Sequence, residues 1–467
     1  MTPLNQWFKH VATREIKVLA IGGSDPSGGA GIQQDIRTIT VLGGYGTAIP
    51  TALTIQNTLG VKDIALVPPE TLSAQLESCL SDIPFDAIKI GMMGSVENVR
   101  VIGRLIKGLS PETPVILDPV MNSKNNKPLL EDSAIEVLKE ELLPHVSIIT
   151  PNIPEALRLL DAPSLGACRQ EELARQLYRA LTKIPSNKER AVIVKGGHSG
   201  EKDLVMDILV DSGGTVSIGG TRIDTVHTHG TGCAFASCLA TLVGGGLGVR
   251  EAFKTCRDFM ELSIVASKGM GRGIGPVNTL ATYWQIVERD MILKLLKEAS
   301  SQLEKHPGAG RLAPEIQINL GYALPYARTR EDVAAFPGRI VRVRDYLRHI
   351  EAPEFGASSH VANIILTAML YDPKKRSAMD IKMDEAFLKK GEALGYKIAS
   401  FSRKDEPKAV KEAEGSSLVW GVKQAIENSG GLVPDLIWDD GDLGKEPAIR
   451  VLGNDPLEVV KKALSLL

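Results

Sequence analysis

The stretch "IKVLAIGGSDPSGGAGIQQDI", residues 16–36, decides the fold class of the N-terminal part of the chain. It begins with an apolar, β-branched run, and five glycines follow that run. A strand that ends in a glycine-rich turn is typical of a βαβ unit. The glycines let the backbone approach a ligand closely, although a tight turn without a ligand explains them equally well. The stretch matches neither the Walker A motif nor the G-x-G-x-x-G fingerprint.

The same alternation continues outward to around residue 280. Further apolar runs end in Gly, Pro, Asp or Asn, and they occupy residues 87–94, 113–121, 146–152 and 190–197. Amphipathic segments, typical of helices, lie between them at residues 133–145 and 170–184. We therefore predict an α/β domain with a central, mostly parallel sheet flanked by helices. In such sheets ligands bind beyond the carboxyl ends of the strands.

The pattern changes after this domain, so the 467 residues are expected to form more than one core. A long helix is predicted over residues 279–306, and "PGAGRLAP" after it resembles a linker. The remaining segment has denser turn signals and a less regular alternation, which favours a separate, smaller α+β domain. The expected divisions are an N-terminal extension, a first domain, a linking helix with linker, and a second domain, at residues 1–15, 16–280, 281–313 and 314–467.

Composition excludes several classes of protein. The net charge is −2, which argues against nucleic acid and anionic membranes as partners. No apolar run approaches the ~20 residues of a membrane span, and the N-terminus lacks the apolar core of a signal peptide. The five cysteines form no C-x-x-C pair, so neither a disulfide framework nor a structural zinc site is indicated. We expect a cytoplasmic protein that forms a homo-oligomer and acts on small molecules.

A second informative stretch is "DTVHTHGTGCAFASC", residues 224–238. Its two histidines and two cysteines suggest a metal site or a reactive thiol, whereas its glycines suggest a phosphate-binding turn before a helix. Cys233 would lie in the first turn, where the helix dipole is expected to lower the pKa of its thiol. As a thiolate, Cys233 could then accept a proton from an attacking alcohol. The alternative is that it is a small buried residue that packs the turn. Cys238 lies about 140° further round the helix, which favours packing and disfavours a shared metal.

Polar residues at the ends of other predicted strands add to this pattern. Asn152 and Glu155 can hold a hydrated Mg²⁺ beside phosphates, but capping of a helix is the favoured explanation from these residues alone. Lys195 can neutralise a transferring phosphoryl group, and a solvated lysine is the alternative. Asp118 ends one more strand.

Taken together, these features make residues 16–278 similar to the ribokinase-like kinases, and in particular to the hydroxymethylpyrimidine and hydroxymethylpyrimidine-phosphate kinases of thiamine biosynthesis. Most ribokinase-like enzymes have an aspartate where this chain has Cys233, and a cysteine is characteristic of the pyrimidine kinases. The matching stretches are "GSDPSGGAGIQQDI", "TALTIQNTLGV", "KIGMMGS", "LDPVM", "TPNIPEA", "VKGGH", "THGTGC" and "GIGPVN".

The resemblance implies a role for each matched residue. The pyrimidine pocket would be lined by Ala30, Asp35, Gln56, Met92 and Val120. The turn of Gly230, Thr231 and Gly232 would form an anion hole beside the catalytic Cys233. ATP is the implied cosubstrate, and Mg²⁺ would be held through its phosphates, without a dedicated protein cage. The groups that organise ATP and Mg²⁺ would be Asp118, Asn152 and Glu155, with Lys195 on the phosphate. Thr54 departs from the more apolar residue expected there.

In the second domain the residues alone say less. Arg339 reads as a surface arginine, His360 follows a Ser-Ser cap, and Lys445 lies in a polar hairpin. However, residues 290–467 are similar to the thiamine-phosphate synthase domain often fused to the pyrimidine kinase. Arg339 and His360 match the functional arginine and histidine of that domain, and related thiamine-phosphate-binding regulators lack the pair. The resemblance therefore implies a catalytic Arg339 and His360.

The expected function is that of a bifunctional enzyme of thiamine biosynthesis. The first domain would phosphorylate 4-amino-5-hydroxymethyl-2-methylpyrimidine and its monophosphate. The second would join the pyrimidine pyrophosphate to thiazole phosphate and release inorganic pyrophosphate. Two alternatives stay open: a pyridoxal-type kinase with an inert second domain, and a kinase fused to a thiamine-phosphate-sensing module.

Overall fold

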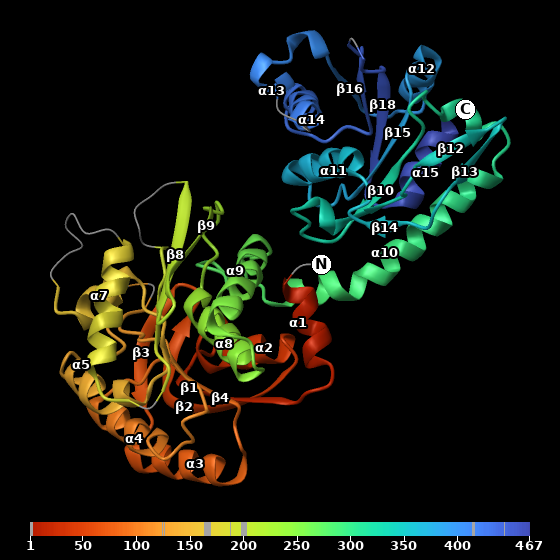
Figure 1. The fold of residues 1–467 in the computed structure, drawn as a ribbon. Coiled ribbons are helices and arrows are strands. Elements are labelled where there is room, and N and C mark those ends of the chain that lie inside the picture. Colours follow the sequence, from red (N-terminus) through yellow and green to blue (C-terminus); the bar gives the residue numbers. More distant parts are fainter. Residues whose placement is uncertain are drawn as a thin grey trace. The chain divides into compact units, whose positions relative to one another are not determined.

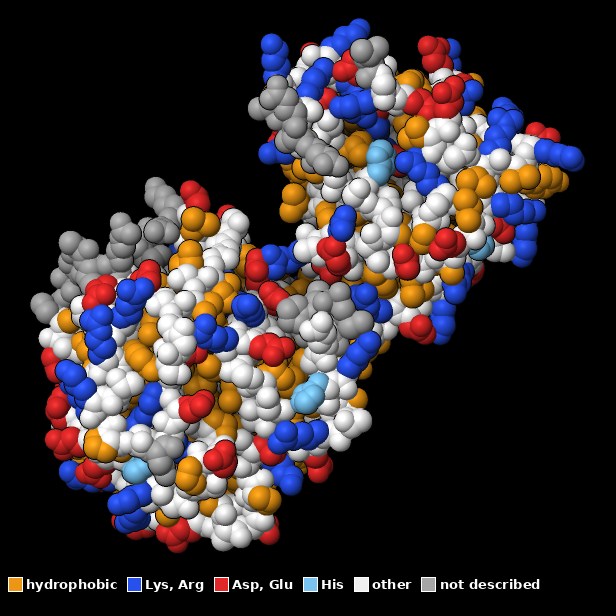
Figure 2. Space-filling view, in the orientation of Figure 1, with side chains coloured by type: hydrophobic (Ala, Val, Ile, Leu, Met, Phe, Trp, Pro, Cys, Tyr) orange, Lys and Arg blue, Asp and Glu red, His pale blue; other side chains and the backbone are white. Residues whose placement is uncertain are grey.

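The computed structural model describes residues 3–123, 125, 127–162, 170–186, 188–197, 203–412, 416–442 and 444–467. The chain divides into two compact units, residues 1–282 and 283–467, which are described separately (Figure 1). On the visible face of each unit, lysine and arginine are interspersed with aspartate and glutamate (Figure 2). Within the described ranges, no helix is long and apolar enough to cross a membrane.

The first unit is built on a nine-stranded sheet in its described residues, in the order β3-β2-β1-β4-β5-β6-β7-β8-β9. Strands β2, β1 and β4 to β7 are mutually parallel. At the edges, β3 pairs antiparallel with β2, β8 pairs antiparallel with β7, and β9 pairs antiparallel with β8. The strands are β1 (Ile16–Ser24), β2 (Gly44–Asn57), β3 (Gly60–Leu66), β4 (Ala87–Ile90), β5 (Val115–Leu117), β6 (Ile148–Ile149), β7 (Ala191–Val194), β8 (Leu204–Asp211) and β9 (Gly214–Thr221).

Helices cover both faces of this sheet, because its central strands are apolar on both sides. One apolar core lies against α3, α4 and α7, and the other against α1, α2, α8 and α9. The helices are α1 (Pro3–Val11), α2 (Gly31–Val41), α3 (Pro69–Asp82), α4 (Val96–Ile106), α5 (Ser133–Val137), α6 (Ile153–Leu159), α7 (Gln170–Lys183), α8 (Thr231–Gly244) and α9 (Val249–Val265), with a π-turn at Leu138–Leu142 and a 3-10 turn at Leu143–His145.

The second unit contains a seven-stranded sheet among its described residues, in the order β14-β11-β10-β15-β18-β17-β16, and a small β12-β13 hairpin. Only the β16–β17 pair is parallel in the described part of that sheet. The strands are β10 (Leu320–Ala323), β11 (Val333–Ala335), β12 (Ile340–Val343), β13 (Tyr346–His349), β14 (Glu354–Phe355), β15 (Ser377–Lys382), β16 (Ile398–Phe401), β17 (Leu436–Asp439) and β18 (Ala448–Gly453).

Helices of the second unit also pack on two faces, with α10, α12 and α15 on one core and α11 and α14 on the other. The predicted smaller α+β domain is confirmed in this respect. The helices are α10 (Leu280–Lys305), α11 (Ser359–Tyr371), α12 (Glu385–Ala393), α13 (Lys408–Glu412), α14 (Ser416–Asn428) and α15 (Pro456–Ser465), with 3-10 turns at Ala309–Leu312, Arg330–Asp332 and Arg403–Asp405.

The division of the chain differs from the predicted one at two places. The segment predicted as a linking helix and linker belongs to the second unit, because Ile292, Leu296 and Leu303 on α10 are fully buried in its core. The predicted N-terminal extension likewise packs into the first unit. There Trp7 is buried, and its Nε1–H donates a hydrogen bond of 2.9 Å to the carbonyl oxygen of Leu42.

Candidate active sites

In the first unit, parallel strands carry the predicted polar residues to one edge of the sheet. Asp118 follows β5, Asn152 follows β6 and Lys195 follows β7. Because β5, β6 and β7 are parallel neighbours, their carboxyl ends meet at the same edge. Lys195 Nζ forms an ion pair of 2.6 Å with Asp118 Oδ1, so these two strand ends lie next to each other.

The two glycine-rich stretches pack directly against each other at this edge. Gly230, at φ 77°, leaves no room for a side chain, because an added Cβ would lie 1.8 Å from the carbonyl oxygen of Gly29. The backbone N–H of Gly31 faces the Cys233 thiol and favours a lower pKa for it. Segments about 200 residues apart in sequence therefore form one backbone cradle.

A histidine and an aspartate hold this cradle together. His229 Nε2 lies 2.9 Å from Asp25 Oδ2, which also accepts the backbone N–H of Ala30 at 2.9 Å. Burial alone would raise the pKa of Asp25, but hydrogen bonds from His229 and Ser27 lower it below its ordinary value. The carboxylate is therefore ionised and fixes the start of α2, where Ala30 is the N-cap residue.

The N-terminus of α8 meets the ion pair of Asp118 and Lys195. A Cβ on Gly232 would lie 3.1 Å from Asp118 Oδ2 and 3.4 Å from Lys195 Nζ. Backbone N–H groups at a helix N-terminus together with a lysine make a favourable environment for phosphate oxygens. Thr231, in the same turn, donates its hydroxyl to the carbonyl oxygen of Thr228.

Asn152 and Glu155 form a reciprocal cap at the start of α6. Asn152 Oδ1 accepts the N–H of Glu155 at 2.9 Å, and Glu155 Oε2 accepts the N–H of Asn152 at 2.8 Å. The capping explanation is thus confirmed, but it is incomplete. Burial, together with the nearby Asp118 carboxylate, raises the pKa of Glu155 to about 7, and Lys195 acts in the opposite direction.

The expectation of a low thiol pKa at Cys233 is wrong. Burial raises the pKa of Cys233 to about 11, and the helix N-terminus does not overcome this desolvation. The Lys89 ammonium acts against the shift by favouring the thiolate. Cys238 is fully buried beside Cys256, so its predicted packing role is confirmed.

Lys89 was not identified from the sequence, although a lysine in the apolar strand "AIKI" of β4 is a usable signal. Its Nζ lies 2.7 Å from Asp35 Oδ2, and both side chains are inaccessible to solvent. Burial would lower the pKa of Lys89, but the Asp35 carboxylate raises it above its ordinary value. Asp35 Oδ1 also accepts the hydroxyl of Ser237 at 2.7 Å. Ser237 lies one turn of α8 after Cys233, on the same face.

The residues implied for the pyrimidine pocket are only partly brought together. Asp35 and Met92 both flank the end of β1, because a Cβ on Gly22 would approach Asp35 Oδ2 at 4.0 Å and Met92 N at 3.8 Å. Val120 is half-buried two residues after Asp118. Gln56 is half-buried on β2, and within the described residues no hydrogen bond or ion pair joins it to the others. Thr54 donates its hydroxyl to the carbonyl oxygen of Ser24 at 2.9 Å.

In the second unit, the candidate histidine contacts a buried carboxylate. His360, in the first turn of α11, places Nε2 at 3.1 Å from Asp380 Oδ2 on β15. Burial alone would raise the pKa of Asp380, but His360, Arg450 and Arg339 lower it below its ordinary value. Arg339 therefore acts on the same carboxylate as His360. Its backbone has φ 70°, and its guanidinium donates to the carbonyl oxygen of Ile316.

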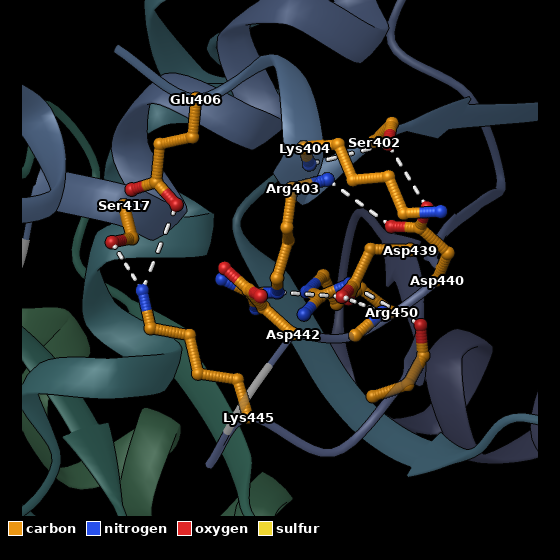
Figure 3. Close-up of polar contacts among 12 residues, drawn as sticks. Ser402, Arg403, Lys404, Glu406, Ser417, Asp439, Asp440, Asp442, Lys445 and Arg450 are labelled. Atoms are coloured by element: carbon orange, nitrogen blue, oxygen red, sulfur yellow. Dashed lines mark hydrogen bonds and ion pairs between the residues drawn. The ribbon is translucent and has the colours of Figure 1, made fainter. Parts of the chain in front are cut away.

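Further charged residues of this unit form ion pairs around Asp439 and Lys445 (Figure 3). Arg450 Nη1 forms an ion pair of 2.6 Å with Asp439 Oδ2, and Arg403 Nε pairs with Asp439 Oδ1 at 2.6 Å. Lys445 points toward Ser417 and Glu406, at 2.9 Å and 3.6 Å. Its segment forms a hairpin, because the backbones of Asp442 and Lys445 pair with each other.

Oxygen ligands are available for Mg²⁺ in the first unit, although no cluster of three or more potential metal-binding side chains occurs in the part of the chain that is described. Asp118 and the buried Glu155 present carboxylates beside Lys195. This set suits an ion that is held mainly through phosphate oxygens and water.

The parallel sheet, with a glycine turn at the N-terminus of α8 and an ion pair at its carboxyl edge, is that of a ribokinase-like kinase. Pyridoxal kinase from Staphylococcus aureus in complex with AMP-PCP has a similar fold, with a TM-score of 0.51 and 29% identity over 57% of this chain and 94% of that chain. The family model of phosphomethylpyrimidine kinase matches residues 25–278, and that of thiamine-phosphate synthase ThiN matches residues 295–465. The chain belongs to the phosphomethylpyrimidine kinase family and carries a thiamine-phosphate synthase domain, so it is a bifunctional enzyme of thiamine biosynthesis.

Similar proteins have been described with one domain or both. The bifunctional thiamine biosynthesis protein ThiDN of Methanocaldococcus jannaschii is 31% identical over 448 residues, which cover 95% of this chain and 97% of that protein. The hydroxymethylpyrimidine/phosphomethylpyrimidine kinase of Escherichia coli is 37% identical over 58% of this chain and all of that protein. The thiamine biosynthesis bifunctional protein ThiED of Geobacter sulfurreducens is 41% identical over 58% of this chain, and the match spans about half of that protein (54%).

Proposed function

We propose that the first unit phosphorylates 4-amino-5-hydroxymethyl-2-methylpyrimidine and then its monophosphate, with ATP and Mg²⁺. The second unit then joins the resulting pyrimidine pyrophosphate to thiazole phosphate. The observation that carries the first part is the close approach of Gly232 to both Asp118 and Lys195 at the N-terminus of α8. The observation that carries the second is the contact of His360 with Asp380, whose charge Arg339 also influences.

In the first phosphorylation, the substrate hydroxyl attacks the γ-phosphorus of ATP, and the bond to the departing ADP breaks. Cys233 is proposed to take the hydroxyl proton, and Lys89 favours the thiolate that this requires. The N–H groups of the 230–232 turn and Lys195 stabilise the negative charge on the transferring group. Mg²⁺, when bound through Asp118 and Glu155, would neutralise the phosphate oxygens.

The second phosphorylation makes a different demand on the same residues. Here the attacking atom is an oxygen of the monophosphate, which is already anionic and needs no base. Cys233 is therefore expected to matter less in this step than in the first. Asp35 and Met92 would contact the pyrimidine at the end of β1 in both steps.

In the condensation, the bond between the pyrimidine methylene carbon and the pyrophosphate oxygen breaks, and the electron pair leaves with pyrophosphate. The thiazole nitrogen supplies the electron pair of the new C–N bond, so no other reactant is needed. Arg339 can bind two oxygens of the leaving group at once, and His360 can donate a hydrogen bond or a proton to it.

One incubation tests both units. The purified chain is supplied with the hydroxymethylpyrimidine, ATP, Mg²⁺ and thiazole phosphate, and thiamine phosphate is measured. Arg339→Ala and His360→Ala should abolish most of the condensation and leave both phosphorylations unchanged. His349→Ala is the matched control, because His349 is equally exposed (33% against 34%) and also faces a carboxylate, Glu304 at 2.7 Å.

The same experiment separates the alternatives. A wild-type chain that binds thiamine phosphate but never forms it would be a kinase with a sensing module. Pyridoxal is supplied in a parallel reaction because the similar solved structure is a pyridoxal kinase. A preference for pyridoxal would overturn the pyrimidine assignment. The cytoplasmic location and the homo-oligomeric state stay predictions.

A further inference from the structure

Asp380 is a buried carboxylate in the middle of the second unit's sheet. It lies on β15, its side chain is 3% exposed, and Arg450 on β18 is its cross-strand partner. One carboxylate oxygen faces His360 Nε2 at 3.1 Å. The other has no hydrogen-bond partner among the described residues, and Arg450 Nε lies 3.9 Å from it. His360 is thus the closest polar partner of this carboxylate that the structure describes.

Arg450 is in turn held by other buried charges. Asp439 forms an ion pair with Arg450 at 2.6 Å, and it accepts hydrogen bonds from Arg403 at 2.6 Å and from the backbone N–H of Gly441 at 2.9 Å (Figure 3). The side chains of Arg450 and Asp439 are at most 1% exposed. We call the series Asp380, Arg450, Asp439 and Arg403 the buried ion row. Its two negative and two positive charges balance, so the row adds no net charge beneath His360.

Stability does not explain the buried ion row well. Apolar residues of similar volume in place of buried ion pairs often leave stability unchanged or improve it. A specific geometry for one attached group accounts better for such a row. At the Asp380 end of the row, the group in contact is the ring of His360, whose charge can change.

The contact fixes which ring nitrogen of His360 carries the proton. The pKa of Asp380 lies below its ordinary value, so the carboxylate is ionised and can only accept hydrogen bonds. Nε2 must then be protonated, and Nδ1 is the nitrogen left for a ligand. His360 follows the N-cap Ser358 by two residues, so Nδ1 is available at a helix N-terminus, where anionic groups bind favourably.

We propose that Asp380 is a positioning residue for the condensation: held by the buried ion row, it binds the Nε2–H of His360, so that the ring carries its second proton on Nδ1, which faces the departing pyrophosphate and donates that proton to it. This inference rests on the proposed synthase function. Asp380 itself acts through His360 and does not touch the reacting atoms.

Asp380→Asn tests the proposal, because an amide keeps the shape and can either accept from or donate to Nε2. The condensation kcat should fall on the order of 10-fold to 100-fold, as found when the partner that orients a functional histidine is removed. The KM for the pyrimidine pyrophosphate should change little, and both phosphorylations should be unchanged. Asp380→Glu, which restores the charge, should recover part of the rate.

The ¹⁵N shifts of the His360 ring give a readout that a purely structural role would not change. In the wild type at pH 8 they should report a protonated Nε2 and a bare Nδ1, and in Asp380→Asn a mixture of tautomers. The His360→Ala spectrum assigns the signals. Asp435→Asn is the matched control, since it removes a 2.6 Å ion pair with Lys462 in the same unit and should alter neither kcat nor tautomer.

An unchanged tautomer or an unchanged kcat in Asp380→Asn would overturn the proposal. If the wild type forms no thiamine phosphate, the proposed synthase function fails, whereas the ring shifts still decide whether Asp380 fixes the tautomer. If Asp380→Asn does not fold, Asp439→Asn decides, because it removes the 2.6 Å anchor of Arg450. It should shift the tautomer and kcat in the same direction by a smaller factor, and an unchanged result there also overturns the proposal.

Discussion

In the first unit, Lys89 and Asp35 are buried within electrostatic reach of Cys233, and in the second unit Asp380 and Arg450 are buried next to His360. Both reactive residues lie in the first turn of a helix. The cation beside Cys233 acts on it through charge, whereas the carboxylate beside His360 contacts its ring directly, at 3.1 Å. We therefore expect the charge of Lys89 to govern the ionisation of the Cys233 thiol, and the position of Asp380 to govern the orientation of the His360 ring.

The largest effect is expected from Cys233→Ala, which removes the group that Lys89 acts on. The first phosphorylation should slow by about 10²-fold to 10⁴-fold, the usual contribution of a base, while nucleotide binding is kept. With a pKa of about 11, more of the thiol ionises as the pH rises from 7 to 9, so the wild-type rate should rise over that range. Steady-state rates for the two phosphorylations, measured separately, check this.

The rate of Cys233→Ala should not rise in the same way, and the second phosphorylation should be less sensitive. Cys79→Ala serves as the control, because Cys79 is a half-buried cysteine outside the site. An equal rate in wild type and Cys233→Ala would reduce Cys233 to a packing residue and end the comparison with His360.

A smaller effect is expected from Lys89→Met, which leaves the Asp35 carboxylate buried without its ion pair. The free energy of unfolding should fall by about 3–5 kcal/mol, the cost of breaking a buried pair from one side. Arg100→Met, which removes an exposed ion pair with Glu141, should cost less than about 1 kcal/mol. Urea unfolding measures both changes.

The double variant Asp35→Asn with Lys89→Met separates stability from charge. It removes both members of the pair, so much of the stability should return, but the thiolate of Cys233 loses its cation. Because Asp35 is also a proposed pyrimidine contact, the rate is measured at saturating pyrimidine; slow phosphorylation there in a stable double variant would support a role of Lys89 through charge. A wild-type rate would contradict it.

The smallest effect concerns pH. Glu155 has a pKa of about 7 in the folded chain against an ordinary 4.5, so the folded state binds its proton more tightly than the unfolded state. The contribution of the protonated Glu155 side chain to the stability of the folded state is complete below pH 4.5 and is lost as the pH rises through 7. The free energy of unfolding of the wild type should thus fall relative to Glu155→Gln by about 2 kcal/mol between pH 5 and 8.

Glutamine is the suitable replacement because it keeps the reciprocal cap with Asn152. The difference between the two unfolding curves isolates Glu155 from other groups that titrate over the same range. A constant difference at all pH values would mean that folding does not shift the pKa of Glu155.

The sequence was sufficient to predict the parallel strands and the residues at their ends. Apolar runs that stop at Asp118, Asn152 and Lys195 place those residues at one sheet edge, because parallel strands all end on the same side. The turn at Gly230 and Gly232 could also be predicted from the sequence, since glycines followed by a helix form a local pattern. The roles carried over from related families stay predictions.

Other features depend on contacts between distant segments and could not be predicted. The partner of Lys89 is Asp35, 54 residues earlier in the chain. The pKa of Cys233 is raised by burial and lowered in part by the Lys89 ammonium, and both effects depend on the folded structure rather than on the local sequence. Asp380 lies on β15, a strand not identified from the sequence, and its register opposite Arg450 is a property of the folded sheet.

The packing of α10 also has a consequence for how the two enzymes can be inherited. Because Ile292, Leu296 and Leu303 complete the core of the second unit, the helix is part of the synthase rather than a spacer between two enzymes. A gene that carried the synthase alone would have to include this helix, and a break placed after it would leave an open core. The natural point for recombination in this chain therefore lies near residue 282, before the apolar face of α10 begins.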